Sequence, residues 1–119
     1  MKPIAAVLSA IAVVAGCAQM TSAPPPEAKA QLAPTGALRV AVLTSNPIIV
    51  TRDAKTGELA GTTVALGRAL TERAGVPARM IEYTAVNRLV EDAASTTAAS
   101  AWDVTVVAID PARRNVFDF

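Results

Sequence analysis

Polar and charged side chains that could bind a small solute follow three apolar segments of the chain. They occupy residues 44–46, 83–84 and 110–113. If the apolar segments are parallel strands, their carboxyl ends meet at one edge of a sheet, where open α/β sheets bind ligands. Predicted helices begin at Thr62 and Thr84 on the same edge, and the N–H groups of helix amino termini carry a partial positive charge. This edge therefore fits an anionic ligand best, such as one with a carboxylate.

The composition excludes several other kinds of site. The chain has no His and a single Cys, Cys17, so zinc sites built from Cys and His, Ser-His-Asp triads and an internal disulfide are impossible. Eleven Lys and Arg residues against ten Asp and Glu residues give a net charge of +1 and form no basic run. Nucleic acid is therefore not expected as a partner, and no cofactor or metal is expected.

The strands that would position these groups are predicted over four segments. Branched apolar residues favour strands over residues 38–43 and 48–51, and residues 53–57 have the Asp, Lys and Gly content of a hairpin turn. Residues 78–83 are expected to form another strand. The nearly continuous apolar run 103–109 is typical of a parallel strand covered on both faces.

Two helices are predicted between these strands. The first spans about residues 62–74 and ends at Gly75. Its expected apolar face consists of Leu66, Ala69, Leu70 and Ala74. The second follows Thr84, which can cap it. Its apolar residues recur at helical spacing, at Val86, Leu89, Val90, Ala93 and Ala94. The alternation of strands and helices predicts an α/β domain with right-handed crossovers and a largely parallel sheet with flanking helices.

The start of the chain is typical of an export signal. The apolar run 4–15 is too short to span a bilayer. It ends in Val14-Ala15-Gly16-Cys17, which resembles the lipobox of bacterial lipoproteins, whose Cys is lipidated and becomes the first residue. Ordinary secretory cleavage is the alternative. Either processing route places the protein in the cell envelope, on the periplasmic or extracytoplasmic face, and lipidation at Cys17 would attach it to the membrane.

The sequence thus predicts three regions. Residues 1–16 form a lipoprotein signal peptide, and residues 17–35 comprise the lipidated Cys and a tether rich in Pro and Ala. Pro24-Pro25-Pro26 favours extended polyproline II within the tether. The folded part is expected over residues 36–119.

Three segments of the folded part share the pattern of a known family. They are residues 36–42, 56–76 and 102–119. In order and spacing they resemble the amino-terminal lobe of family 3 extracellular solute-binding proteins, the receptors of bacterial ABC importers for amino acids and related polar solutes. The resemblance implies the first part of one lobe of a periplasmic-binding-protein-like (type 2) fold. Because the family continues through a hinge into a second lobe, it also implies a chain cut short before that lobe.

The resemblance further implies roles for charged residues. In the family, the Arg that matches Arg113 binds the ligand carboxylate, which a planar guanidinium can do with two parallel hydrogen bonds. The alternative for Arg113 is a solvated side chain or one paired with Asp110. Asp110 itself is expected mainly as a helix N-cap before Pro111, and a contact with a ligand ammonium is its second interpretation.

Ligand contacts are also expected from uncharged residues at the strand ends. The family places contacts in the loop after the first strand, here Ser45 and Asn46, although Asn before Pro also commonly opens a turn. Tyr83 could supply a ring to the ligand, but a Tyr at a sheet edge more often serves packing.

The resemblance implies a tethered receptor that binds an amino acid or other carboxylate and delivers it to an ABC importer permease. Two other functions remain open. The same fold hosts dehydratase-like enzymes, although no acid or base is placed beside Arg113 by the pattern. A tethered sensor or interaction module is suggested by residues 106–108, which are Val-Val-Ala where the family usually carries hydroxyls.

Overall fold

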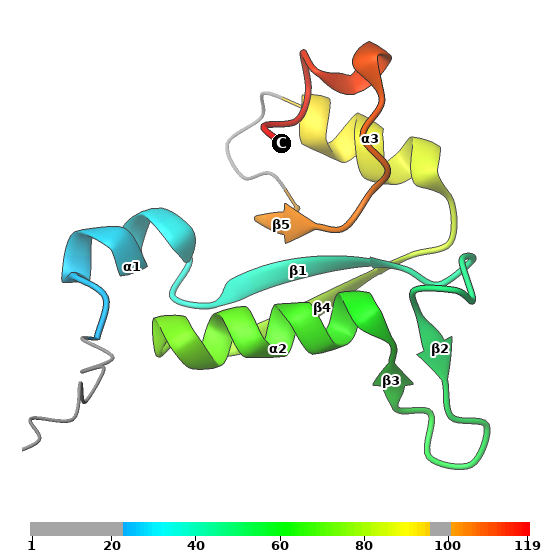
Figure 1. Cartoon of the computed structure of the whole chain (residues 1–119), viewed down its shortest axis with the longest axis horizontal. Helices are drawn as coiled ribbons and strands as arrows, with labels where there is room; N and C mark the ends of the chain where they lie inside the picture. Colours follow the sequence, from blue (N-terminus) through cyan, green and yellow to red (C-terminus); the bar gives the residue numbers. More distant parts are fainter. Residues whose placement is uncertain (1–22, 96–100) are drawn as a thin grey trace, which may run out of the picture.

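The computed structural model describes residues 23–95 and 101–119, which form an α/β domain (Figure 1). The signal peptide, the lipobox and Cys17 predicted from the sequence lie outside the described residues. None of the helices in the described ranges could span a lipid bilayer.

A parallel sheet of three strands, in the order β4-β1-β5, forms the centre of the domain. The middle strand β1 (Leu38–Leu43) pairs along its whole length with β4 (Ala78–Tyr83). On its other side β1 pairs with β5 (Val104–Thr105) over only two residues. The predicted parallel sheet is therefore confirmed, as are the strands at 38–43 and 78–83.

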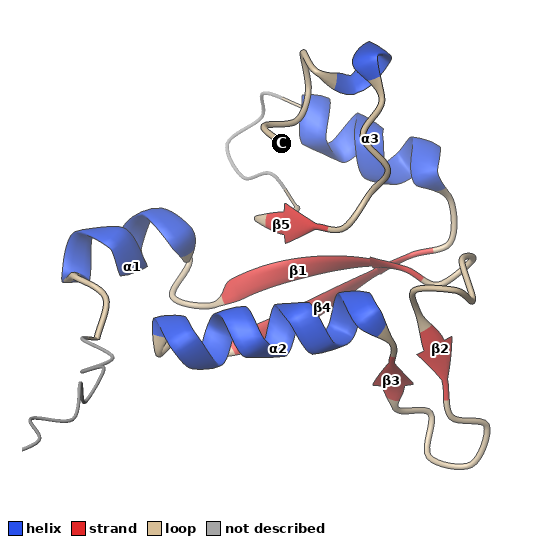
Figure 2. Cartoon of the chain, viewed as in Figure 1, coloured by secondary structure: helices blue, strands red, loops and turns tan. Residues whose placement is uncertain are grey.

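Helices α2 (Thr62–Ala74) and α3 (Val86–Ala94) cover opposite faces of this sheet (Figure 2). Alternate residues of β1 enter two separate apolar cores. The core beneath α2 contains Leu38, Val40, Val42, Val50 and Val64. The core beneath α3 contains Ala41, Tyr83, Leu89 and Trp102. Burial on both faces is the reason that β1 is apolar at nearly every position.

The helix α2 packs on the sheet through a different face from the one predicted. Leu66 and Leu70 are 54% and 36% exposed, so the expectation that they face the core is wrong. The buried residues of α2 are Thr63, Val64, Gly67, Thr71 and Ala74. A Cβ on Gly67 would lie 2.9 Å from Cγ1 of Val40. The absence of a side chain there lets the helix backbone approach β1 closely, which the larger Leu side chains would prevent. Gly75 ends the helix in a left-handed conformation, as predicted.

The predicted hairpin is present but begins later than expected. Strands β2 (Thr51–Arg52) and β3 (Leu59–Ala60) pair antiparallel, and Asp53 orders the turn by accepting hydrogen bonds from the N–H groups of Lys55 and Thr56. The expected strand over 48–51 is wrong in its first part, because Ile48 lies in a turn and is 86% exposed.

Two further boundaries differ from the sequence prediction. The apolar run 103–109 forms a strand only over Val104–Thr105, and Ile109 is 71% exposed. Among the described residues, β5 is an outer strand that pairs with β1 alone. The cap of α3 is Ala85 rather than Thr84, and it makes no side-chain hydrogen bond to the helix.

Part of the segment predicted as an extended tether is helical. Helix α1 (Pro26–Leu32) begins with Pro, which suits the first helical position, and continues with good helix formers. Ala33, which follows it, is buried in the core beneath α2, and Leu32 packs against that core. The packed part of the chain thus begins before residue 36.

Candidate functional site

The carboxyl ends of β1 and β4 are joined at the edge of the sheet that the sequence analysis selected. The carbonyl oxygen of Tyr83 accepts two hydrogen bonds from Thr44, one from its N–H at 2.8 Å and one from the Thr44 hydroxyl at 3.2 Å. Ser45 follows directly and is exposed. The ends of the two strands, and the loops that leave them, are therefore held next to each other.

The amino terminus of α2 is fixed to the same edge. The N–H of Thr63 donates to the carbonyl oxygen of Ile49 at 3.2 Å, which ties the helix start to the turn after β1. Gly61 precedes the helix with a φ of 110°, and a Cβ there would lie 2.5 Å from the same oxygen. Glycine is thus required where the chain turns into α2. Helix α3 begins just beyond β4, so both helices start at this edge, as predicted.

Asn46 organises the turn that follows β1. Its side-chain Oδ1 accepts a hydrogen bond from the N–H of Ile48 at 3.2 Å, and its carbonyl oxygen accepts from the N–H groups of Ile49 and Val50. This geometry confirms the interpretation of Asn46 as a turn opener. Its role as a ligand contact, like that of Ser45, stays a prediction.

Tyr83 is a core residue with a polar partner. Its side chain is buried beneath α3, and its hydroxyl donates a hydrogen bond to Oδ2 of Asp92 at 2.7 Å. Burial and the Asp92 carboxylate raise the pKa of Tyr83 to about 12. The packing interpretation of Tyr83 is therefore confirmed, and its hydroxyl is already engaged within the domain.

Asp110 caps a short 3-10 helix, η1 (Pro111–Arg113), as the sequence predicted. Its Oδ1 accepts a hydrogen bond from the N–H of Ala112 at 3.0 Å. The Nε atom of Arg113 lies 3.8 Å from Oδ2 of Asp110, and the Arg113 side chain is 27% exposed. Arg113 thus makes the local ion pair that was its alternative interpretation.

The structure brings together only some of the predicted site residues. Residues 44–46 and Tyr83 meet at the edge of the sheet, where β1 and β4 end. Figure 1 shows the short helix η1 beyond α3, well away from the turn after β1. No hydrogen bond or ion pair within the described residues joins Arg113 or Asp110 to that turn.

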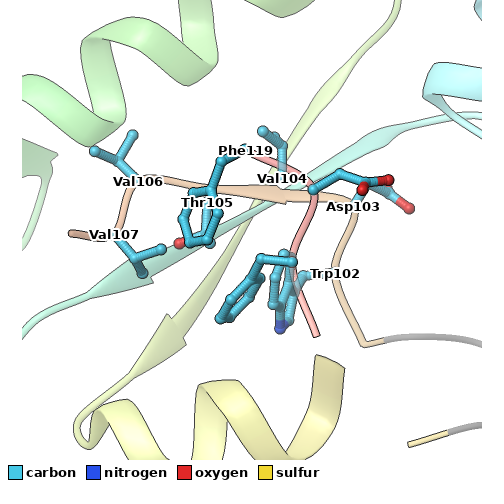
Figure 3. Close-up of a pocket in the computed structure, with 9 residues that line it drawn as sticks. Trp102, Asp103, Val104, Thr105, Val106, Val107 and Phe119 are labelled. Carbon is cyan, nitrogen blue, oxygen red and sulfur yellow. The ribbon is translucent and has the colours of Figure 1, made fainter. Parts of the chain in front are cut away.

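A pocket that the sequence analysis missed lies between β5 and the end of the chain (Figure 3). It has a volume of about 280 Å³ and is lined by Trp102, Asp103, Val104, Thr105, Val106, Val107, Phe117, Asp118 and Phe119. The rings of Trp102 and Phe117 stack with their centroids 5.7 Å apart. The single Trp and both Phe residues fall within residues 102–119, and this clustering is the signal that could have found the pocket.

No group of acidic, His or Cys side chains suited to a metal ion occurs in the part of the chain that the structure describes. Comparisons with protein-family models, with curated proteins and with solved structures each found no match.

Proposed function

We propose that the chain is part of a membrane-tethered extracytoplasmic receptor, which binds a small polar carboxylate and delivers it to the permease of an ABC importer. The observation that carries the proposal is the edge of the parallel sheet at which β1 and β4 end together and α2 and α3 both begin. The resemblance of the sequence to family 3 solute-binding proteins supplies the transport role.

The electrostatics of this edge support an anionic ligand. Two helix amino termini direct partial positive charge towards it, and Ser45 is exposed there. Arg113 supplies the full positive charge of the proposed site. Because η1 lies beyond α3 and Arg113 within it is paired with Asp110, ligand binding through Arg113 would require η1 to move towards the edge.

A panel of carboxylates tests the proposal. Thermal unfolding of the full chain should shift upwards with the correct solute, since a ligand that binds only the folded state stabilises it. We expect Arg113→Ala to weaken that binding by on the order of 2 to 5 kcal/mol, as for loss of one partner of a buried charge pair, measured by calorimetry.

Arg114→Ala is the matched control, because it removes the same charge one residue away. Loss of polar-carboxylate binding in this variant, with normal binding in Arg113→Ala, would show that the proposed site is wrong. Turnover of the bound solute would point instead to an enzyme.

The anchor has an independent test. Metabolic labelling with a fatty acid should mark the wild-type protein and leave Cys17→Ala unlabelled, because Cys17 is the only thiol available for lipidation. Retention of the label in the variant would refute the lipobox.

One observation favours a tethered interaction module as the second candidate. Large apolar side chains are exposed on α2 and near the end of the chain, at Leu66, Leu70, Ile109 and Phe119. Neighbouring exposed apolar side chains often mark an interaction surface, and Leu66 and Leu70 lie one helical turn apart on α2. If no carboxylate shifts the melting temperature, this candidate replaces the receptor.

A further inference from the structure

A second pocket lies next to the one along β5 and has a different chemical character. It is open, has a volume of about 460 Å³, and is lined by Ile109, Arg114, Phe117 and Phe119. Phe117 and Phe119 also line the pocket along β5, so the two hollows share an aromatic wall. Three of the four lining residues are apolar, and the fourth is a cation.

The aromatic wall is anchored to the core of the domain. The ring of Phe117 lies 5.7 Å from that of Trp102 and 5.9 Å from that of Phe119, measured between centroids. Trp102 is only 7% exposed, and its indole N–H donates to the carbonyl oxygen of Leu89 in α3. The inner rings are therefore fixed in place, while Phe119 remains 56% exposed and accessible to a ligand.

The two neighbouring arginines differ in what they contact. Arg113 lies beside Asp110, whereas no ion pair or side-chain hydrogen bond joins Arg114 to any other residue in the described ranges. Arg114 thus lines an apolar pocket with its charge unpaired there. The two acidic residues nearest to Arg114 in sequence are Asp110 and Asp118, each four residues away. Asp110 lies beside Arg113, and Asp118 lines the pocket along β5 rather than this one.

We infer that this pocket binds a monocarboxylate with an aromatic or branched apolar body. The guanidinium of Arg114 pairs with the carboxylate through two parallel hydrogen bonds, which are strong because both partners are charged. The rings of Phe117 and Phe119 and the side chain of Ile109 contact the apolar body, where offset or edge-to-face ring packing is favourable. The inference concerns a different set of residues from the sheet edge and holds whether or not the chain is a transport receptor.

The single Trp provides a direct probe of the site. Trp102 stacks on Phe117, so a ligand that contacts Phe117 and Phe119 should change the fluorescence emission of Trp102. We propose titrating the full chain with 3-phenylpropanoate, with 3-phenylpropanol as the matched compound that lacks the charge. Calorimetry under the same conditions detects binding that leaves the emission unchanged.

The acid should bind more tightly than the alcohol, and Arg114→Ala should weaken binding of the acid by roughly tenfold to a hundredfold, as expected for loss of a hydrogen bond between charged groups. Arg114→Lys should recover part of that loss, because it retains the charge but not the planar fork. Phe119→Ala should weaken both compounds, whereas Arg79→Ala, which removes an exposed guanidinium from β4, should weaken neither. Both Arg114 and Phe119 are exposed, so these variants should fold normally.

Equal affinity for the acid and the alcohol would overturn the inference, as would loss of binding in Arg113→Ala in place of Arg114→Ala. Failure of both compounds to bind would also overturn it. Binding of succinate that depends on Arg113 alone would support the proposed receptor without supporting this pocket, so the two proposals can fail separately.

Discussion

The two sides of the central strand β1 are held by different forces. On one side, β4 pairs with β1 along its full length, and α2 closes over the resulting surface. On the other side, β5 contributes only two residues to the sheet, and the chain from residue 106 onwards leaves it (Figure 1). The comparison shows that a long backbone ladder can fix one neighbour of a strand while side chains fix the other.

Side-chain contacts, rather than a long ladder, fix the β5 side. Arg39 and Asp103 form a buried ion pair, in which Nη2 of Arg39 lies 2.6 Å from Oδ1 of Asp103. Oδ2 of Asp103 also accepts from the backbone N–H of Arg39 at 2.8 Å. The hydroxyl of Thr105 donates to the carbonyl oxygen of Ala41. The indole N–H of Trp102 donates to the carbonyl oxygen of Leu89. Because Trp102, Asp103 and Thr105 also line the pocket along β5, these contacts hold the walls of that pocket in position.

The largest expected effect comes from removing the ion pair. Asp103→Ala leaves a nearly buried guanidinium without its partner and should lower the free energy of unfolding by about 3 to 5 kcal/mol. Chemical denaturation measures the loss. Amide exchange should accelerate at Thr105 far more than at Met80 in β4. Asp118→Ala, which removes an exposed carboxylate, is the control and should change little.

The same ion pair predicts how stability depends on pH. Burial disfavours the charged carboxylate, but the hydrogen bonds and positive charge of Arg39 outweigh this and lower the pKa of Asp103 below its ordinary 3.8. Because the folded-state pKa is lowered, the stabilisation is present above pH 3.8 and is lost as the pH falls through the folded value. Asp103→Asn should therefore flatten the acid limb of the stability curve. An unchanged limb would mean that the pair contributes nothing to acid sensitivity.

A smaller effect is expected where α2 contacts β1. Gly67→Ala places a Cβ 2.9 Å from a methyl group of Val40, which is 2% exposed and has little room to move. The clash should outweigh the gain in helix propensity and destabilise the protein by about 1 to 2 kcal/mol in thermal unfolding. In a Val40→Ala background the methyl groups are gone, and Gly67→Ala should become stabilising. Destabilisation of equal size in both backgrounds would rule out the contact as its cause.

The smallest effect concerns the hydrogen bond between Tyr83 and Asp92. Tyr83→Phe should cost about 1 kcal/mol, the usual net contribution of one hydrogen bond. Since Tyr83 is the only Tyr in the chain, its pKa of about 12 can be measured by absorbance titration. Its folded-state pKa is raised, so the stabilisation is present below pH 10.0 and is lost as the pH rises towards about 12.

Asp92→Asn gives the complementary measurement. It should lower the pKa of Tyr83 but leave it above 10.0, because burial is the larger cause of the shift. A pKa at the ordinary value in the wild-type protein would show that the ring is more accessible than its packing beneath α3 implies.

Local patterns were sufficient to predict much of this fold. The strands at 38–43 and 78–83, the turn at Asp53 and the left-handed stop at Gly75 all appear in the structure where the sequence indicated. The turn and the stop depend on interactions within a few residues, and β1 is buried along nearly its whole length. The cap at Asp110 belongs to the same group, because its partner is two residues away.

Only the tertiary structure decided which apolar residues are buried and which polar residues meet. Periodicity assigned Leu66 and Leu70 to the core, but packing density favoured the small residues around Gly67, which allow α2 to approach β1. The run 103–109 has strand composition throughout, yet within residues 23–95 and 101–119 it pairs with no strand but β1, and just two residues take part. The ion pair of Arg39 with Asp103, 64 residues apart, and the aromatic pocket beside it depend on contacts between distant segments, which no local pattern encodes.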